Sequence, residues 1–355
     1  MARVGIRDVA AAAGVSPTTV SLVLNGRAPE RIPESTRERV RTTAAQLGYE
    51  PNALARGLRT QRTHTIGLIS DKIATTPYAV RMVEAAQDVA RQHGRLVFLV
   101  NTDGDVALEH DAVQALLARQ VDGLVYACMW HRIVEPPEGL PAGTVFLDCA
   151  PVRGGYPAVV PDDQGGARTA VRALLDAGHR RIAYVDIEED PLPIASGLRL
   201  AGYRDELLAA GIDPDPALHV RTASNAAGGR AAVDRLLALP ADRRPTGVFF
   251  FNDRMAAGAY TSVRHHDLRI PEDLSVVGYD DQQLIAAELD PPLTTVALPH
   301  YEMGRWATKV LLGRIEAPDG EDGVLRMPCP LIPRASVGPP PAMPGQPAGG
   351  GVQQP

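Results

Sequence analysis

The stretch IRDVAAAAGVSPTTVSLVLNG, residues 6–26, decides the fold of the N-terminal end of the chain. Its apolar residues recur at helical spacing as far as Gly14, a residue typical of a helix C-terminus. Ser16 then supplies a helix N-cap, and Pro17 takes the first helical position, where a missing N–H costs nothing. The second helix is predicted to end at the turn dipeptide 25–26. The stretch therefore predicts two short helices joined by a tight turn.

A third helix is predicted from Pro33 to Leu47, with Val40 and Ala44 on its apolar face. Two helices joined by a tight glycine-containing turn, with a third helix packed across them, form the helix-turn-helix geometry. A unit of this size buries little apolar surface and should be only marginally stable alone. The sequence thus predicts a small all-α head over residues 1–50.

The net charge of this head is opposite in sign to that of the remaining chain. Residues 1–64 contain ten arginines and five acidic residues, a net charge of +5, although the whole chain carries −6. A basic segment on an acidic body predicts that only the head contacts a polyanion such as DNA. A randomly charged surface is the alternative that charge alone leaves open.

The overall composition is typical of a globular protein, since 45% of the 355 residues are hydrophobic and 22% are charged. No apolar run reaches the roughly 18 residues of a membrane-spanning helix, and the charges near the N-terminus argue against a secretory signal. The three cysteines, Cys128, Cys149 and Cys329, form no CxxC pair, which argues against a disulfide framework or a zinc site. We therefore expect a cytoplasmic protein that contacts no membrane and uses no metal and no cofactor.

Two segments of the chain are predicted to lack stable structure of their own. Residues 51–64 form a hinge and linker, because the helix-forming stretch 53–59 is only about two turns long and contains Gly57. Residues 338–355 are rich in proline and glycine and are predicted to be disordered.

From residue 65 onward, apolar runs of strand length alternate with amphipathic helices. The predicted strands are 66–70, 96–100, 123–127, 144–148, 182–186, 247–251 and 275–279. The predicted helices are 79–93, 109–119, 167–177, 200–210, 226–239 and 255–266. Buried strands that alternate with helices indicate parallel sheets covered on both faces, with ligands bound beyond the carboxyl ends of the strands. Residues 65–337 exceed what one such sheet usually holds, so we predict an α/β body of two lobes.

Residues 6–26 closely resemble the DNA-binding head of the LacI/GalR family of transcriptional repressors. The resemblance continues in family order to about residue 335, through PNALAR at 51–56, RLAGY at 199–203, NDRMA at 252–256 and IPEDLSVVGYDD at 270–281. It implies a homodimer on a pseudo-palindromic operator in double-stranded DNA. The second head helix would enter the major groove, and paired hinge helices would enter the minor groove.

This resemblance assigns DNA contacts to ten residues. The base-facing residues would be Pro17, Thr18 and Leu22, those nearer the phosphates Ser16, Thr19, Ser21 and Asn25, and those of the hinge Asn52, Ala55 and Leu58. Leu22 stands where arginine is frequent, and leucine cannot form the bidentate pair with guanine, so guanine readout should be weak there. Leu22 could instead be a helix-core residue. Leu58 would unstack the central base step as an apolar wedge, or else pack the hinge onto the body.

The body resembles type I periplasmic sugar-binding proteins, which have two lobes and a ligand cleft. The residues that match the family's polar effector contacts are Asp148, Arg199, Asn252 and Asp280, three of them expected at strand ends and Arg199 at a helix start. This set suits a sugar or sugar derivative, because carboxylates accept and Arg and Asn donate hydrogen bonds. Alternatively, Asp280 could cap a turn and Arg199 could be a surface charge.

Aromatic contacts to the effector are fewer than is usual in the family. Tyr78 could stack on a sugar face or pack in the core. Where many relatives have a second aromatic, this chain has Ala223, and Trp130 could either substitute for that aromatic or be a buried tryptophan.

Other classes of protein explain less of the sequence. The chain has no GxSxG, GxxxxGK[ST] or HExxH motif, which argues against an enzyme. A transport binding protein would lack the head, and an architectural DNA-binding protein would not need the cleft. We therefore predict a transcriptional repressor whose operator affinity is switched by a small polar effector. A dimer is expected, because the C-terminus has no leucine-heptad segment.

Overall fold

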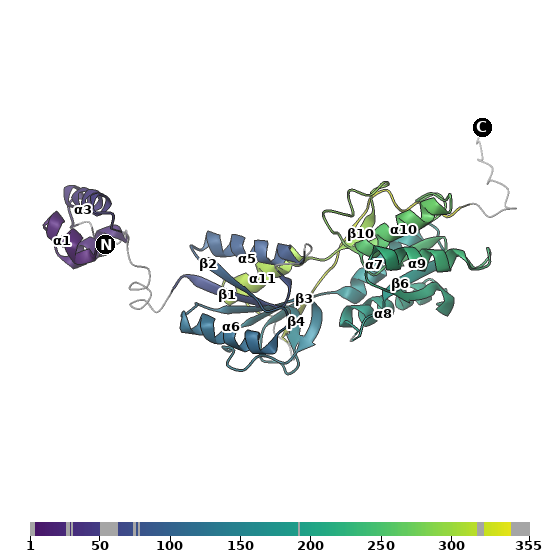
Figure 1. Ribbon diagram of the computed structural model, residues 1–355, viewed down its shortest axis with the longest axis horizontal. Helices are drawn as coiled ribbons and strands as arrows, with labels where there is room; N and C mark the ends of the chain where they lie inside the picture. Colours follow the sequence, from purple (N-terminus) through teal and green to yellow (C-terminus); the bar gives the residue numbers. More distant parts are fainter. Residues whose placement is uncertain are drawn as a thin grey trace, which may run out of the picture. The chain divides into compact units, whose positions relative to one another are not determined.

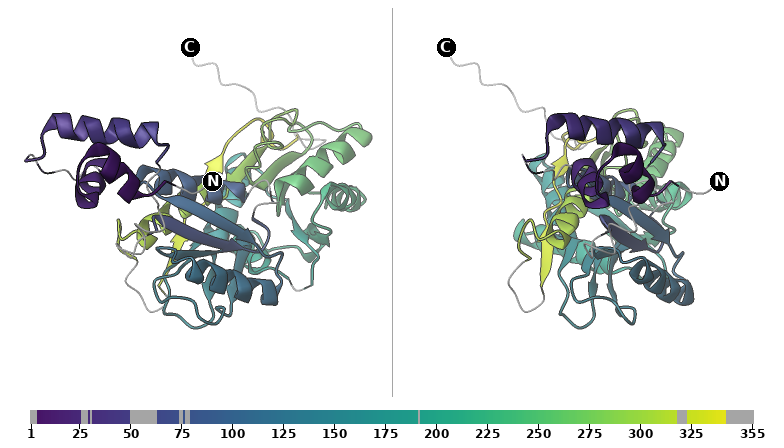
Figure 2. Two further views of the ribbon diagram at one scale, coloured as in Figure 1. Left: turned by 60° about the vertical axis from the view of Figure 1, so that its left-hand side comes forward. Right: turned by 90° about the vertical axis from the view of Figure 1, so that its left-hand side faces the viewer.

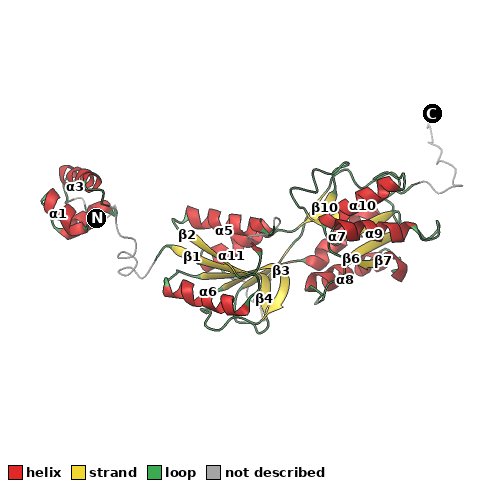
Figure 3. Ribbon diagram, in the orientation of Figure 1, coloured by secondary structure: helices red, strands yellow, loops and turns green. Residues whose placement is uncertain are grey.

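The computed structural model describes residues 4–25, 29, 31–49, 63–73, 76, 79–190, 192–317 and 323–341. The chain divides into two compact units, one of residues 1–64 with 120–122 and one of residues 65–119 with 123–355 (Figure 1). The described part of the head is helical, and the body contains two six-stranded sheets flanked by helices (Figure 3). The predicted fold class, an all-α head and an α/β body of two lobes, is confirmed.

The helices of the head are α1 (Ile6–Ala13), α2 (Pro17–Leu24) and α3 (Glu34–Gln46). Gly14 ends α1 with a φ of 66°, a left-handed conformation that favours glycine. The side chain of Ser16 caps α2 by accepting a hydrogen bond from the Thr19 amide at 3.1 Å. The apolar cluster between the helices consists of Val9, Ala10, Ala13, Val20, Val23, Val40 and Ala44. The local signals read from the sequence therefore form the head as predicted.

The first lobe is built on a parallel sheet with the strand order β11-β5-β4-β3-β1-β2. Its strands are β1 (Thr65–Ser70), β2 (Leu96–Asn101), β3 (Leu124–Val134), β4 (Val145–Pro151), β5 (Ala158–Pro161) and β11 (Val324–Met327). Its helices are α5 (Val80–Gln92), α6 (Val106–Ala118) and α11 (His300–Leu311). Ile66 and Leu68 pack in one cluster with α5 and α11, whereas Gly67 faces Leu116 of α6. The sheet is thus covered on both faces (Figure 1).

The second lobe repeats this plan with the strand order β12-β10-β9-β8-β6-β7, in which the β10–β12 pair is antiparallel. Its strands are β6 (Ile182–Ile187), β7 (His219–Thr222), β8 (Gly247–Phe250), β9 (Ser275–Asp280), β10 (Thr294–Ala297) and β12 (Leu331–Ile332). Its helices are α7 (Asp163–Asp176), α8 (Ile194–Ala209), α9 (Ala226–Leu237), α10 (Asp253–His265) and the short 3₁₀-helix η2 (Pro216–Leu218). Helix α7 packs on α8, and α9 packs on α10.

Within the described residues the chain passes between the two lobes three times. The crossings lie between β5 and α7, between β10 and α11, and between β11 and β12. As a result α11, which comes late in the chain, lies beside α5 in the first lobe (Figure 2). Residues at these crossings are therefore placed where the two lobes meet.

The sequence prediction missed several elements of the body. It gave no strand at β5, β7, β10, β11 or β12, which are two to four residues long and too short for a periodic pattern to identify. It also gave no helix at α11, which begins after Pro299 without a side-chain cap. Helix α8 begins at Ile194, six residues before its predicted start.

The predicted disorder of residues 338–355 is wrong for the start of that segment. The carbonyl of Gly338 accepts hydrogen bonds from the Nε2 atom of His179 at 2.9 Å and the hydroxyl of Ser275 at 3.2 Å. The amide of Gly338 donates to the same hydroxyl at 3.0 Å. The backbone is ordered here because a buried histidine and a buried serine pair with it. Residues 342–355 lie outside the described residues.

Candidate ligand site and nucleic-acid interface

The four predicted polar effector residues line one small cavity in the body. Asp148, Arg199, Asn252 and Asp280 surround a space of about 40 Å³. Two of them come from strands, Asp148 from β4 and Asp280 from the end of β9. Arg199 comes from α8, and Asn252 is the N-cap residue of α10, two residues after β8. Two local expectations were wrong. Asp148 lies inside β4, which continues to Pro151, and Arg199 lies in the second turn of α8 because that helix begins early.

Arg199 is buried and its guanidinium group is held from several sides. Its Nε atom donates to Oδ1 of Asp163 at 2.9 Å, and its Nη1 atom donates to the carbonyl of Phe251 at 2.5 Å. The centre of the guanidinium lies 3.6 Å from the ring centroid of Tyr279 and 4.3 Å from that of Phe251. Only 3% of Arg199 is exposed, which excludes the interpretation as a surface charge.

Asp163, at the start of α7, is a charged residue of this cavity that the sequence analysis missed. Besides Arg199, its carboxylate contacts Nδ1 of His131 at 3.1 Å. Burial opposes its charge, but Arg199 and His131 outweigh that effect, so the pKa of Asp163 is lowered. The signal was present in the sequence: Asp162 and Asp163 follow the apolar run 158–161, a strand of only four residues.

Asp148 has a carboxylate oxygen without a partner in the described part of the chain. The residue is 2% exposed, and its Oδ2 atom lies 3.6 Å from Nε2 of His300. Its Oδ1 atom is buried and accepts no hydrogen bond from any described residue. Burial raises the pKa of Asp148, while His300 opposes the shift. A buried acceptor in this state needs a donor, and a ligand hydroxyl would provide one.

The side chain of Asp280 is only 7% exposed, and it is partly paired. Its Oδ2 atom accepts a hydrogen bond from Gln282 at 2.9 Å, and its Oδ1 atom lies 3.9 Å from Nη1 of Arg199. Burial raises the pKa of Asp280 to about 6, although Arg199 and Gln282 oppose the shift. The hydrogen bond to Gln282 means that Asp280 stabilises the following turn as well as lining the cavity.

Asn252 uses both ends of its side chain within the protein. Its Oδ1 atom caps α10 by accepting from the Met255 amide at 2.9 Å, and its Nδ2 atom donates to Ser224 at 2.9 Å. The residue is nevertheless at the cavity wall. Asn252 therefore fixes the start of α10 at the edge of the site.

The backbone is strained at two of these aspartates. Asp148 has a φ of 56° and Asp280 a φ of 103°, and the next residue, Asp281, has a φ of 51°. Residues other than glycine rarely adopt such values, and they cluster at functional sites where the surrounding structure holds them. Two of the four cavity residues are thus held in a strained backbone conformation.

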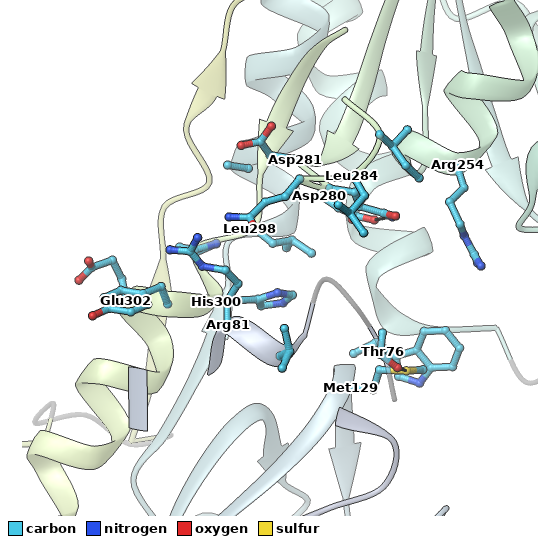
Figure 4. Close-up of a pocket in the computed structure, with 18 of the residues that line it drawn as sticks. Thr76, Arg81, Met129, Arg254, Asp280, Asp281, Leu284, Leu298, His300 and Glu302 are labelled. Carbon is cyan, nitrogen blue, oxygen red and sulfur yellow. Dashed lines mark hydrogen bonds between the residues drawn. The ribbon is translucent and has the colours of Figure 1, made fainter. Parts of the chain in front are cut away.

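A larger cavity of about 880 Å³ adjoins the small one (Figure 4). The two cavities share the lining residues Met129, Trp130, Arg254, Asp280, Gln282 and Leu298. Trp130 is 36% exposed, so it is not the buried tryptophan that the sequence left open. Tyr78, the other predicted aromatic, lies outside the described residues.

The predicted DNA contacts of the head lie on and around α2. Ser16, Pro17 and Thr18 are exposed, whereas Thr19, Ser21, Leu22 and Asn25 are partly exposed. Leu22 belongs neither to the apolar cluster of the head nor to the side chains that pack against that cluster, which argues against a helix-core role. Asn52, Ala55 and Leu58 lie outside the described residues.

The described residues contain no cluster of three or more His, Cys, Asp or Glu side chains arranged to hold a metal ion. In the same part of the chain, no helix is both long enough and apolar enough to cross a membrane.

Comparison with known proteins places both parts of the chain in one family. Residues 5–52 match the family described as bacterial regulatory proteins, lacI family, and residues 171–337 match the periplasmic binding protein-like domain. The ribose operon repressor of Escherichia coli K12 is 34% identical over 337 residues, which cover 94% of this chain and 99% of that protein. The HTH-type transcriptional repressor PurR of Aliivibrio fischeri ES114 is 32% identical over 337 residues, which cover 94% of this chain and 98% of that protein.

Solved structures give the same result. The lac repressor dimer bound to operator and the anti-inducer ONPF matches with a TM-score of 0.74 and 27% identity, over 95% of this chain and 100% of that chain. The complex of the transcriptional regulator CelR with cellobiose matches with a TM-score of 0.60 and 32% identity, over 94% of this chain and 100% of that chain. The relatives are repressors rather than enzymes. The chain belongs to the LacI family of bacterial transcriptional regulators.

Proposed function

We propose that this LacI-family regulator is a repressor whose affinity for its operator is changed by a carbohydrate bound at Asp148, Arg199, Asn252 and Asp280. In this proposal residues 1–50 bind DNA, residues 51–64 form the hinge, and the body from residue 65 binds the effector and dimerises. The observation that carries it is the convergence of these four residues on one cavity. As a DNA-binding regulator the protein would act in the cytoplasm, at the nucleoid.

The chemistry of the cavity supports a ligand rich in hydroxyl groups. Asp148 offers a buried oxygen that accepts no bond from a described residue, and Asp280 is partly paired. Carboxylates of this kind accept hydrogen bonds from adjacent hydroxyls. The names of two relatives, a ribose operon repressor and a regulator solved with cellobiose, point to the same class.

The exposed edge of the first lobe supports a homodimer. Strand β2 lies at the end of its sheet, and its apolar side chains Leu96, Phe98 and Leu99 are 67%, 43% and 36% exposed. Proteins rarely leave an apolar edge strand uncovered, because it invites pairing and aggregation. A second copy of the chain is the partner that we propose for this edge.

The three crossings between the lobes suggest how the ligand could act. Asp148 belongs to the first-lobe strand β4 and Arg199 to the second-lobe helix α8, so a ligand that contacts both favours one lobe arrangement. In a dimer this arrangement would set the spacing of the two hinges. The coupling between effector and operator should then be about 1–3 kcal/mol and reciprocal.

A thermal-shift screen of the purified protein against sugars, polyols, sugar phosphates and nucleosides tests the ligand site. A ligand present at about 100 times its dissociation constant should add about 2.7 kcal/mol to the free energy of unfolding. Asp148→Asn should abolish the shift, because an amide does not reproduce the paired acceptor oxygens of a carboxylate.

Asp267→Asn is the matched control for this variant. Asp267 also has a positive φ, 55°, but it is exposed and lines neither cavity. Its substitution should leave the shift unchanged. A ligand that stabilises the Asp148 variant as much as the parent protein would rule out the proposed site.

A further inference from the structure

Trp130 lies at an irregularity in β3, and contacts with Asp71 hold this part of the strand in place. The pairing of β3 with β4 shifts register between Ala127 and Arg132. The carboxylate of Asp71 accepts a hydrogen bond from the Met129 amide at 2.9 Å and pairs with Arg132 at 2.8 Å. One buried side chain therefore holds the backbone amide before Trp130 and the guanidinium group of Arg132 after it. A large aromatic residue held rigidly in this way can offer a binding surface with little loss of conformational entropy.

Trp130 lies where the two cavities meet. It lines both the small cavity of about 40 Å³ and the large one of about 880 Å³. The small cavity has room for only a few groups of the size of a hydroxyl. A sugar that engages Asp148 and Asp280 there must therefore extend into the large cavity, whose wall includes Trp130.

The small cavity disfavours an anionic ligand. Three carboxylates, those of Asp148, Asp163 and Asp280, line this cavity together with two guanidinium groups, those of Arg199 and Arg254. Arg199 already donates to Asp163 and to a backbone carbonyl. A phosphate placed here would meet more carboxylates than guanidinium groups, whereas neutral hydroxyls would find acceptors.

The arginines that line the large cavity are also engaged. Arg254 donates to the carbonyl of Ser224 at 2.8 Å, and Arg81 lies 3.5 Å from Glu84. Apolar side chains make up much of the remaining wall, among them Trp130, Met129 and Leu298. At about 880 Å³ this cavity is near the upper end of the range for small-molecule sites, and it holds considerably more than one pyranose ring.

We infer that the effector is a neutral carbohydrate of at least two rings, with one ring at Asp148 and Asp280 and the next ring stacked on Trp130. Trp130 then determines specificity. Stacking on it increases the affinity for a ligand with a second ring, but not the affinity for a ligand that ends at the first ring. This inference rests on the proposed function and narrows it from any small polar effector to neutral oligosaccharides and glycosides.

The sequence offers a direct probe, since Trp130 and Trp306 are the two tryptophans of the chain. Trp306 packs against the apolar cluster of the first lobe and lines neither cavity. In the Trp306→Phe protein the tryptophan fluorescence comes from Trp130 alone. Neutral disaccharides of glucose, galactose, mannose and xylose, the parent monosaccharides and the hexose 6-phosphates are each titrated into this protein, with calorimetry in parallel.

We expect one or more disaccharides to bind and to shift the emission to shorter wavelength. In the same background Trp130→Ala should weaken disaccharide binding roughly tenfold or more and change monosaccharide binding less than about twofold. Trp130→Phe keeps an aromatic face and should retain most of the disaccharide affinity. It also separates a loss of stacking from a loss of folding, which thermal melting monitors in each variant.

Other outcomes would overturn the inference. A monosaccharide that binds as tightly as its disaccharides, or equal losses for both on Trp130→Ala, would remove the role of Trp130. Tighter binding of a 6-phosphate than of its neutral sugar would remove the charge argument. In these cases the proposed function survives if Asp148→Asn still abolishes binding. Binding of no carbohydrate at all would overturn both the inference and the carbohydrate part of the proposed function.

Discussion

Three aspartates line the candidate ligand site, and their different partners shift their pKa values in different directions. Asp163 is paired with Arg199 and contacts His131, so its pKa is lowered despite burial. Asp148 and Asp280 have weaker partners, and burial raises the pKa of each. Asp163 therefore stays charged and pairs with Arg199, whereas Asp148 and Asp280 are costly to ionise when no ligand is bound.

Asp280→Asn should stabilise the body at neutral pH. Since burial raises the pKa of Asp280 to about 6, the folded protein binds this proton more tightly than the unfolded chain, whose pKa is near 3.8. Stability due to this group is thus present at low pH and falls as the pH rises from about 4 to 6. The variant does not lose this stability as the pH rises. Its free energy of unfolding should therefore exceed that of the parent protein by about 2–3 kcal/mol at pH 7.5, and by less at pH 4.5. Asparagine also tolerates the positive φ of this position.

Urea unfolding followed by tryptophan fluorescence measures this difference, because both tryptophans belong to the body. The same variant should bind the effector more weakly, so stability and binding would change in opposite directions. A destabilised variant at pH 7.5, or a gain that does not depend on pH, would contradict the assignment of a raised pKa to Asp280.

At the scale of elements, the packing of α7 against α8 holds Arg199 next to Asp163. A Cβ atom at Gly202 of α8 would lie 2.3 Å from the carbonyl oxygen of Gln164 in α7. The absence of a side chain at Gly202 thus permits the close approach of the two helices. On the same helix, a Cβ atom at Gly197 would meet nothing within 4 Å.

Gly202→Ala and Gly197→Ala should therefore have effects of opposite sign. The first forces the helices apart and should cost about 1–3 kcal/mol or more, with weaker effector binding because Arg199 moves away from Asp163. The second only reduces the freedom of the unfolded chain and should add about 0.5–1 kcal/mol. Urea unfolding of both variants tests this pair. Equal destabilisation by both would mean that helix propensity, not the helix contact, controls the stability of α8.

Elements with strong local signals could be predicted from the sequence, including the four-residue strand β8, whereas most of the shortest strands and the uncapped helix α11 could not. The head helices have a cap, a helix-ending glycine and an apolar stripe, so their positions followed from local chemistry. Strand β5 has four residues, and its pairing with β4 and β11 is visible only in the folded sheet. Because β5 was not recognised, the functional position of Asp163 at its carboxyl end was missed as well.

The candidate ligand site, too, could be predicted only in part from the sequence. The resemblance identified Asp148, Arg199, Asn252 and Asp280, and the fold brings them to one cavity. His131 was not predicted, because β3 was expected to end at residue 127 and in fact continues through a register shift. An irregularity of this kind depends on the tertiary partner Asp71, which local patterns do not reveal.

At the scale of the whole molecule, the proposed regulation requires that ligand binding to the body changes the affinity of the head for DNA. In the proposal the basic head contacts the phosphates and the cavity of the body holds the ligand, and the body also has an exposed apolar edge at β2. Because the coupling is a free energy between two sites, the operator should change effector affinity by the same factor as the effector changes operator affinity.

The most direct measurement is the affinity of the full chain for its selected operator, with and without the stabilising ligand. DNA fragments retained by the protein are sequenced, and the enriched site is titrated by fluorescence anisotropy between 50 and 200 mM salt. We predict an inverted repeat, a steep loss of affinity with salt, and a change of about 5- to 150-fold when the ligand is added. Binding without an inverted repeat, or an operator affinity that a bound ligand leaves unchanged, would contradict the proposal of a ligand-switched dimeric repressor.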